Sequence, residues 1–190
     1  MHAECPLLTE AAMNAIDLLI KQHDKTKEAL KKGSEGKLGA AELRRAADEL
    51  VAHMVIEEHV FYPRIRELDK DLVKESFEEH AVARFELARA LVAKGEEQEV
   101  RLGVLKELVE HHIEEEQDEL FPKVRRGIPK AELEALGRKM EQMFEQAVEL
   151  GLEKLVVGHA DLKKAPEPSA QNGQRRSGTM RRGREHAAAR

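Results

Sequence analysis

Two stretches of the chain share a pattern that carries chemistry. HMVIEEHVFYP begins at His53 and HIEEEQDELFP begins at His112, and in each a glutamate follows the histidine by four positions. Each stretch ends on a proline that follows an aromatic residue. Residues four positions apart lie on one face of a helix, so each copy places an imidazole beside a carboxylate. Imidazole and carboxylate without thiolate form a donor set for iron, manganese or zinc.

Two more histidines precede the repeated pattern, one expected helix earlier in each case. His23 comes before His53, His80 comes before His112, and all four lie on the apolar side of their segments. One such histidine alone is usually a core residue satisfied by one hydrogen bond. Six polar side chains in one core would instead cost several kcal/mol each if they lacked partners. A metal centre accounts for all six candidate ligands, which are His23, His53, Glu57, His80, His112 and Glu116.

The number of these donors favours two ions over one. Two six-coordinate ions offer about twelve positions. Four imidazoles, two bridging carboxylates and one bridging oxygen would fill about ten of them. About two positions would then remain for water or a small ligand. The pattern therefore predicts a two-metal site that keeps room for an exogenous molecule.

Five amphipathic helices are expected to position these side chains. Apolar residues recur at the period of a helix, and Gly or Pro residues separate the segments. Thr9 is the expected N-cap of the first helix, and Pro63 is expected to end or kink the second. Four helices of about twenty residues with short connections are typical of an up-down-up-down four-helix bundle, with the fifth as an additional C-terminal helix. The expected elements of this all-α fold span residues 9–32, 40–62, 71–93, 97–121 and 130–157.

Composition favours a helical protein that does not span a membrane. The chain of 190 residues is 41% hydrophobic and 36% charged, with no Trp and one Tyr. No apolar run approaches the roughly 20 residues that cross a bilayer, and the N-terminus lacks the pattern of a signal peptide. The single cysteine, Cys5, excludes an internal disulfide and a thiolate cluster. A cytoplasmic protein is therefore expected.

Charge and composition divide the chain into three parts. An N-terminal extension is expected over residues 1–8, a helical bundle over 9–158 and a basic tail over 159–190. The tail has eight Lys or Arg against three Asp or Glu, whereas the whole chain has a net charge of −5. Its Pro, Gly, Ser, Gln and Arg content predicts disorder. The acidic remainder disfavours nucleic acid as the main partner. The tail is expected to be a solvated extension, and contact of its arginines with RNA, DNA or an acidic partner is the alternative.

The doubled H-x3-E pattern with its upstream histidines resembles the hemerythrin-like HHE cation-binding family, over about residues 10–145. The resemblance implies the hemerythrin four-helix bundle and two non-haem iron ions joined by an oxo or hydroxo bridge. It implies the same six ligands, with Glu57 and Glu116 as bridges between the ions. The small molecules that it implies as ligands or substrates are O2, peroxide and NO.

One position departs from the pattern of the oxygen-carrying hemerythrins. Those proteins have an additional histidine in the third helix, spaced H-x3-H. Here the positions four residues from His80 are Ser76 and Arg84. By the count of positions given above, this absence opens a coordination position. It favours peroxide or NO chemistry, or iron sensing or storage, over reversible oxygen transport alone.

Two functions from different classes remain open at this level. The first is a binding protein that holds iron and a small ligand such as O2 or NO, for sensing or storage. The second is an oxidoreductase that disproportionates peroxide in a catalase-like way or removes nitric oxide, under oxidative or nitrosative stress. The E-x-x-H motifs of ferritin-like proteins and the H-E-x-x-H motif of metalloproteases are missing from the sequence.

Neighbours of the motifs have secondary expectations. His59 and His111 lie off the apolar stripe and are expected at the surface or behind the ligands. Glu58 or Glu115 would replace a carboxylate ligand if the helices were rotated. Tyr62 is expected to pack at the end of the bundle, where a tyrosine near iron would be redox-active.

Overall fold

The computed structural model describes residues 13–151, and this part of the chain is all helical, without a strand. The all-α prediction is confirmed for these residues. The extension over 1–8, the end of the fifth expected helix and the tail over 159–190 lie outside them. The elements are α1 (Ala15–Ser34), α2 (Ala40–Ile56), η1 (Glu57–Phe61), α3 (Tyr62–Ile65), α4 (Lys70–Val92), α5 (Glu96–Glu115), η2 (Glu116–Leu120), α6 (Phe121–Gly127) and α7 (Lys130–Leu150).

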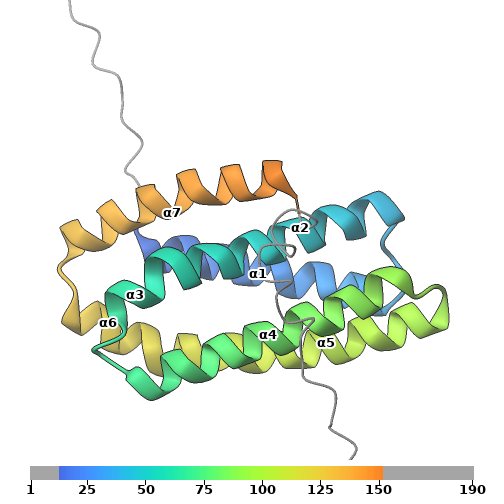
Figure 1. Cartoon of the computed structure of the whole chain (residues 1–190), viewed down its shortest axis with the longest axis horizontal. Coiled ribbons are helices and arrows are strands. Elements are labelled where there is room, and N and C mark those ends of the chain that lie inside the picture. The colour runs from blue at the N-terminus through green and yellow to red at the C-terminus, as the bar shows by residue number, and fades with distance from the viewer. Residues whose placement is uncertain (1–12, 152–190) are drawn as a thin grey trace, which may run out of the picture. The chain divides into compact units, whose positions relative to one another are not determined.

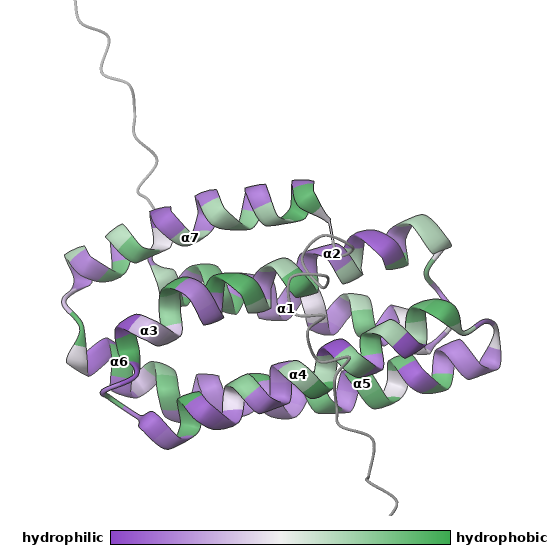
Figure 2. Cartoon of the chain, in the orientation of Figure 1, coloured by the Kyte–Doolittle hydropathy of each residue, from purple (hydrophilic) through white to green (hydrophobic). Residues whose placement is uncertain are grey.

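Successive long helices run in opposite directions along a common axis (Figure 1). Helix α5 packs along both α1 and α4, and α2 also contacts α1 and α4. Helix α7 lies against α1 and α2. Each long helix carries both hydrophobic and hydrophilic residues along its length (Figure 2), as amphipathic helices do. None of the described helices is long and apolar enough to cross a membrane.

Side-chain caps set where two of the long helices begin. The side chain of Asn14 accepts a hydrogen bond of 3.1 Å from the backbone N–H of Asp17, so α1 begins after Asn14. The predicted cap, Thr9, lies outside the described residues, and the start predicted for this helix was wrong. Asp69 caps α4 in the same way, through a bond of 3.1 Å from the backbone N–H of Leu72. Both caps satisfy backbone donors that a helix N-terminus leaves free.

The prolines do not end their helices. Pro63 was expected to end or kink the second helix near Tyr62, yet the helical chain continues to Ile65. The segment before the proline is the π-helix η1, in which the backbone N–H of Tyr62 bonds to the carbonyl of Glu57, five residues back. A proline ring clashes with the carbonyl four residues earlier in a regular helix. We infer that the wider π-turn makes room for the ring and lets the helix continue.

A π-turn before a proline also occurs in the second half of the chain. The backbone N–H of Phe121 bonds to the carbonyl of Glu116 in η2, and α6 continues through Pro122 to Gly127. The fourth predicted helix therefore stopped six residues short. In both halves the π-helix begins on the glutamate of the repeated motif, and π-turns are often found at functional sites.

Apolar side chains form two separate clusters. One gathers near η1, α3, α6 and the start of α1, and helix α7 closes it from outside. The other lies around the middle of α2 and α5 and the second half of α4. The first includes Ile16, Leu19, Phe61, Tyr62, Leu120 and Phe121, and the second includes Leu30, Leu50, Met54, Leu87, Leu102 and Leu105. The buried histidines and glutamates of the repeated motifs belong to neither cluster.

Candidate metal centre

All six predicted ligands come together inside the protein. The histidines come one each from α1, α2, α4 and α5, and the glutamates are the first residues of η1 and η2. Every one of them is at most 6% exposed. The side chains brought together are His23, His53, Glu57, His80, His112 and Glu116. Their role as ligands stays a prediction, but their convergence is a property of the fold.

The histidines meet in two pairs through their Nε2 atoms. The Nε2 atoms of His23 and His53 lie 3.1 Å apart, and those of His80 and His112 also lie 3.1 Å apart. Two imidazole nitrogens at right angles on one metal, each about 2.1 Å from it, would be separated by about 3.0 Å. Each pair therefore has the spacing of two adjacent positions on a single ion.

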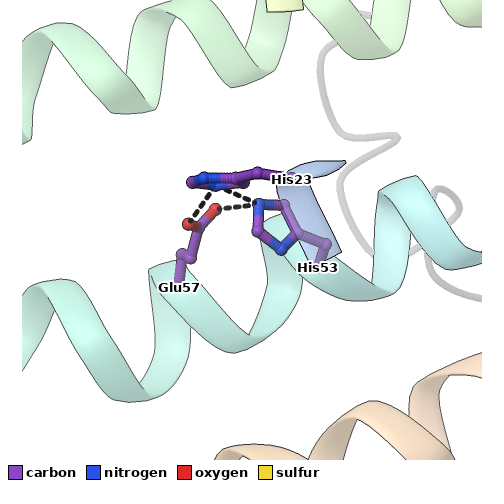
Figure 3. A group of neighbouring side chains, drawn as sticks. All are labelled: His23, His53 and Glu57. Atoms are coloured by element: carbon purple, nitrogen blue, oxygen red, sulfur yellow. Dashed lines mark hydrogen bonds and ion pairs between the residues drawn. The ribbon is translucent and has the colours of Figure 1, made fainter. Parts of the chain in front are cut away.

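The two glutamates lie between the pairs. Oε2 of Glu57 lies 3.3 Å from Nε2 of His53 and 3.3 Å from Nε2 of His80, and its Oε1 lies 3.8 Å from Nε2 of His23. Figure 3 shows this carboxylate facing the imidazoles of His23 and His53. Oε2 of Glu116 lies 3.3 Å from Nε2 of His23 and 3.8 Å from that of His112. Each carboxylate thus reaches histidines of both pairs, as a bridge must.

The outer ring nitrogens of the His80–His112 pair face carboxylates. Nδ1 of His80 lies 2.9 Å from Oε1 of Glu58, and Nδ1 of His112 lies 2.7 Å from Oε2 of Glu79. An ionised carboxylate only accepts, so each Nδ1 carries the proton and donates it. For neutral rings, both Nε2 atoms then face inward with bare lone pairs. Two such nitrogens 3.1 Å apart repel each other unless a proton or a metal cation lies between them.

The outer nitrogens of the His23–His53 pair face amides instead. Nδ1 of His53 donates to Oε1 of Gln22 at 2.8 Å, which leaves its Nε2 bare. The amide nitrogen of Gln117, which can only donate, lies 3.1 Å from Nδ1 of His23. A neutral His23 therefore carries its proton on Nε2 and can donate it to Nε2 of His53. This pair is satisfied by a hydrogen bond within itself.

Buried charge at the centre lacks compensation from the surrounding protein. Both oxygens of Glu57 and Oε2 of Glu116 are buried and have no hydrogen-bond partner among the described residues. Burial raises the pKa of Glu57 well above its usual value, and the charge of Glu116 raises it further. Burial also lowers the pKa of His80 to about 4, against the opposing effect of its bond to Glu58. Burial acts to lower the pKa of His112, but the charge of Glu116 and the bond to Glu79 raise it above its usual value. Imidazoles around unpartnered carboxylate oxygens are a fitting environment for metal cations.

Residues 14–124 match the family described as the hemerythrin HHE cation binding domain. This chain belongs to the hemerythrin HHE family. The matched segment contains all six predicted ligands, and the family predicted from the doubled motif is confirmed. No curated protein and no solved structure gave a match.

The hydroxyl of Tyr62 reaches the candidate centre of this HHE domain. Its Oη lies 2.9 Å from Oε1 of Glu116 and 3.5 Å from Nε2 of His80. Ser76, one of the two positions where the additional third-helix histidine of the oxygen-carrying hemerythrins would stand, instead bonds to the carbonyl of Leu72 at 2.9 Å. The ring of Tyr62 does join an apolar cluster, as the sequence predicted, but its hydroxyl reaches the centre. A residue five positions along a π-turn lies one turn above, so η1 brings Tyr62 over Glu57.

The other neighbours of the motifs stay outside the ring of inner nitrogens. Glu58 faces the outer nitrogen of His80, and both its oxygens bind the guanidinium of Arg84 at 2.8 and 2.9 Å. Glu115 groups with Glu79 and the exposed His111. Sequence reasoning missed three outer partners: Gln22, Glu79 and Gln117. A signal was present only for Gln117, which directly follows a motif glutamate.

A small cavity adjoins the histidines of this HHE domain. Its volume is about 10 Å³, and all four histidines of the site line it. Most of the other lining side chains are apolar, among them Leu50, Met54 and Ile113, and Thr26 and Glu79 also line it. A cavity of this size holds about one water-sized molecule. The cavity therefore has room for one very small molecule beside the four histidines.

Proposed function

We propose that this protein is a non-haem di-iron protein that binds two iron ions and a small ligand such as O2 or NO. The observation that carries the proposal is the pairing of four inner Nε2 atoms, 3.1 Å apart in each pair, around carboxylates with unpartnered oxygens. Burying these unpartnered polar groups without cations costs free energy, and bound cations would give them partners. Bound iron would supply coordination of the small ligand and one-electron redox chemistry.

Each pair of histidines would hold one ion. His23 and His53 form one position, His80 and His112 form the other, and the two glutamates bridge them. Imidazole and carboxylate donors suit iron, manganese and zinc alike, and membership of the hemerythrin family favours iron. The helices α1, α2 with α3, α4, and α5 with α6 would form the up-down-up-down four-helix bundle, with α7 as the additional helix.

The cavity supports a diatomic or triatomic ligand. Its apolar walls would exclude bulk water and favour uncharged molecules such as O2 or NO. Its size excludes larger substrates. The proposed role is therefore ligand binding, sensing or iron storage at a closed centre.

A second function, removal of peroxide or nitric oxide, is favoured by Tyr62. Its hydroxyl lies beside both Glu116 and His80 and can hold a proton there. Burial raises the pKa of Tyr62 well above its usual value, so the phenol stays protonated. A positioned O–H group at the centre suits a reaction that transfers protons between oxygen atoms, such as peroxide disproportionation, which consumes no net protons.

Anaerobic loading with Fe(II), followed by metal analysis, tests the first proposal. We expect about two irons per chain in the wild type and a clear loss in His53→Ala. His111→Ala is the matched control, because His111 is exposed, and it should keep its iron. Wild-type protein without stoichiometric iron, or full iron retention in His53→Ala, would overturn the assignment. Turnover of peroxide or NO by the loaded protein would favour the second function, and a stable O2 or NO adduct without turnover would favour the first.

A further inference from the structure

The two halves of the candidate centre differ in what stands behind their histidines. Behind the His80–His112 pair lie the carboxylates of Glu58 and Glu79, at 2.9 and 2.7 Å from the outer nitrogens. Behind the His23–His53 pair lie only the amides of Gln22 and Gln117. The inner geometry is nearly the same in both halves, with 3.1 Å between Nε2 atoms. The halves therefore differ in charge rather than in spacing.

A carboxylate behind a histidine makes that histidine a stronger ligand. It accepts the Nδ1 proton, fixes the ring with Nε2 bare and raises the basicity of Nε2. An amide oxygen accepts the same proton but adds no negative charge. Arg84 binds both oxygens of Glu58 and offsets its charge, so Glu79 supplies the net negative charge close to the ion. That charge stabilises a bound cation.

Protons add a second difference between the halves. When the rings of His80 and His112 are neutral, both of their Nε2 atoms lack a proton, so both lone pairs can bind a cation. In the His23–His53 pair, Gln117 donates to Nδ1 of His23 and leaves the proton on Nε2. A metal can bind there only after that proton moves to Nδ1 and the Gln117 amide turns over to accept it.

We propose that the two metal positions are unequal, and that the His80–His112 position binds its ion first and more tightly. This inference rests on the proposed two-metal function. Glu58 and Glu79 act as positioning residues for the tight half, and Gln22 and Gln117 leave the other half weaker.

Anaerobic titration with Co(II), followed by its visible absorption and by calorimetry, tests the order of binding without any assay of activity. We expect two separate binding steps in the wild type. His53→Ala should keep one tight step, and His112→Ala should keep one weak step. Glu79→Gln should weaken the tight step by about 10- to 100-fold, the usual effect of losing such a partner. Gln22→Glu should strengthen the weak step instead.

The two charge variants are matched in size and opposite in sign, so a general structural disturbance cannot mimic both results. Glu79 is partly exposed at the surface, and thermal unfolding of the metal-free variants checks that they fold. If Glu79→Gln does not fold, Gln22→Glu still decides the matter. Two ions bound with equal affinity, or a Gln22→Glu protein whose weak step does not strengthen, would overturn the inequality and leave the di-metal function standing. Fewer than two Co(II) ions per wild-type chain would overturn both.

Discussion

The phenol of Tyr62 donates a hydrogen bond of 2.9 Å to Oε1 of Glu116, across 54 positions of the sequence. The bond joins the helical segment of the first motif to the carboxylate of the second. It leaves Oε2 of Glu116 directed at His23 and His112. One phenol thus orients a carboxylate that belongs to the other half of the chain.

Replacing Tyr62 by Phe keeps the ring and removes this donor. A buried acceptor left without its partner costs about 1–3 kcal/mol. We expect Tyr62→Phe to lower the free energy of unfolding of the metal-free protein by about that amount, measured by urea denaturation. The variant should still bind two irons, because no predicted ligand is lost. An unchanged urea midpoint would show that the hydrogen bond contributes nothing to stability.

Removal of metal should destabilise the wild type strongly. Ions that bind only the folded chain stabilise it by about 2.7 kcal/mol when their concentration is 100 times the Kd. We expect chelation to lower the melting temperature by several degrees for each such increment, followed by circular dichroism. The same chelator should have a smaller effect on Glu57→Gln, since that variant lacks a proposed bridge and binds its ions more weakly. Equal shifts in both proteins would argue against Glu57 as a ligand.

The charge of Glu57 predicts how the metal-free protein responds to pH. Its folded pKa is raised above the usual value of 4.5, so the folded state holds this proton more tightly than the unfolded state. The stability that this proton contributes is present below pH 4.5 and is lost as the pH rises through the folded pKa. We expect the free energy of unfolding of metal-free wild type to fall, relative to Glu57→Gln, as the pH is raised above 4.5. Parallel curves for the two proteins would contradict this.

Gly137 tests how α7 docks. A Cβ at this position would lie 2.2 Å from the carbonyl oxygen of Met13, just before α1, so Gly137→Ala must push the two helices apart. Overpacking of this kind costs about 1–3 kcal/mol. Gly103→Ala is the matched control, because the nearest atom there, on Ser34, is 3.9 Å away. We expect lower stability for Gly137→Ala in urea and unchanged iron content for both. Loss of iron in Gly137→Ala would mean that α7 helps to hold the centre.

Helical periodicity predicted which side chains share a face, and this was enough to single out the six residues that converge. His23 and Glu116 could be recognised from the sequence alone because each follows the apolar stripe of its own helix. The outer partners could not be found in this way. Whether Glu79 meets His112 depends on the rotation and register of α4 against α5, and one sequence does not encode that contact as a local pattern.

The π-helices escaped prediction for a related reason. A proline in a helical pattern normally indicates an end, so the expected helices stopped near Tyr62 and Phe121. The apolar side chains of Ile65 and Val124, which continue the helix beyond each proline, were the available sign that the chain goes on. Their significance depends on the hydrogen-bond shift inside η1 and η2, which only the backbone reveals.

The π-turn of η1 also makes the position of the Tyr62 phenol depend on the number of residues between Glu57 and Tyr62. One residue added between Glu57 and Tyr62 would rotate the phenol by about 100° around the helix axis and carry it away from Glu116. One residue removed would turn the π-turn into a regular α-turn and leave the tyrosine above Glu57. All six inward-facing side chains precede that point or lie on other helices, so their own positions along the helices would not change. A single insertion there can therefore separate the tyrosine from the centre, whereas a single deletion keeps the two in contact.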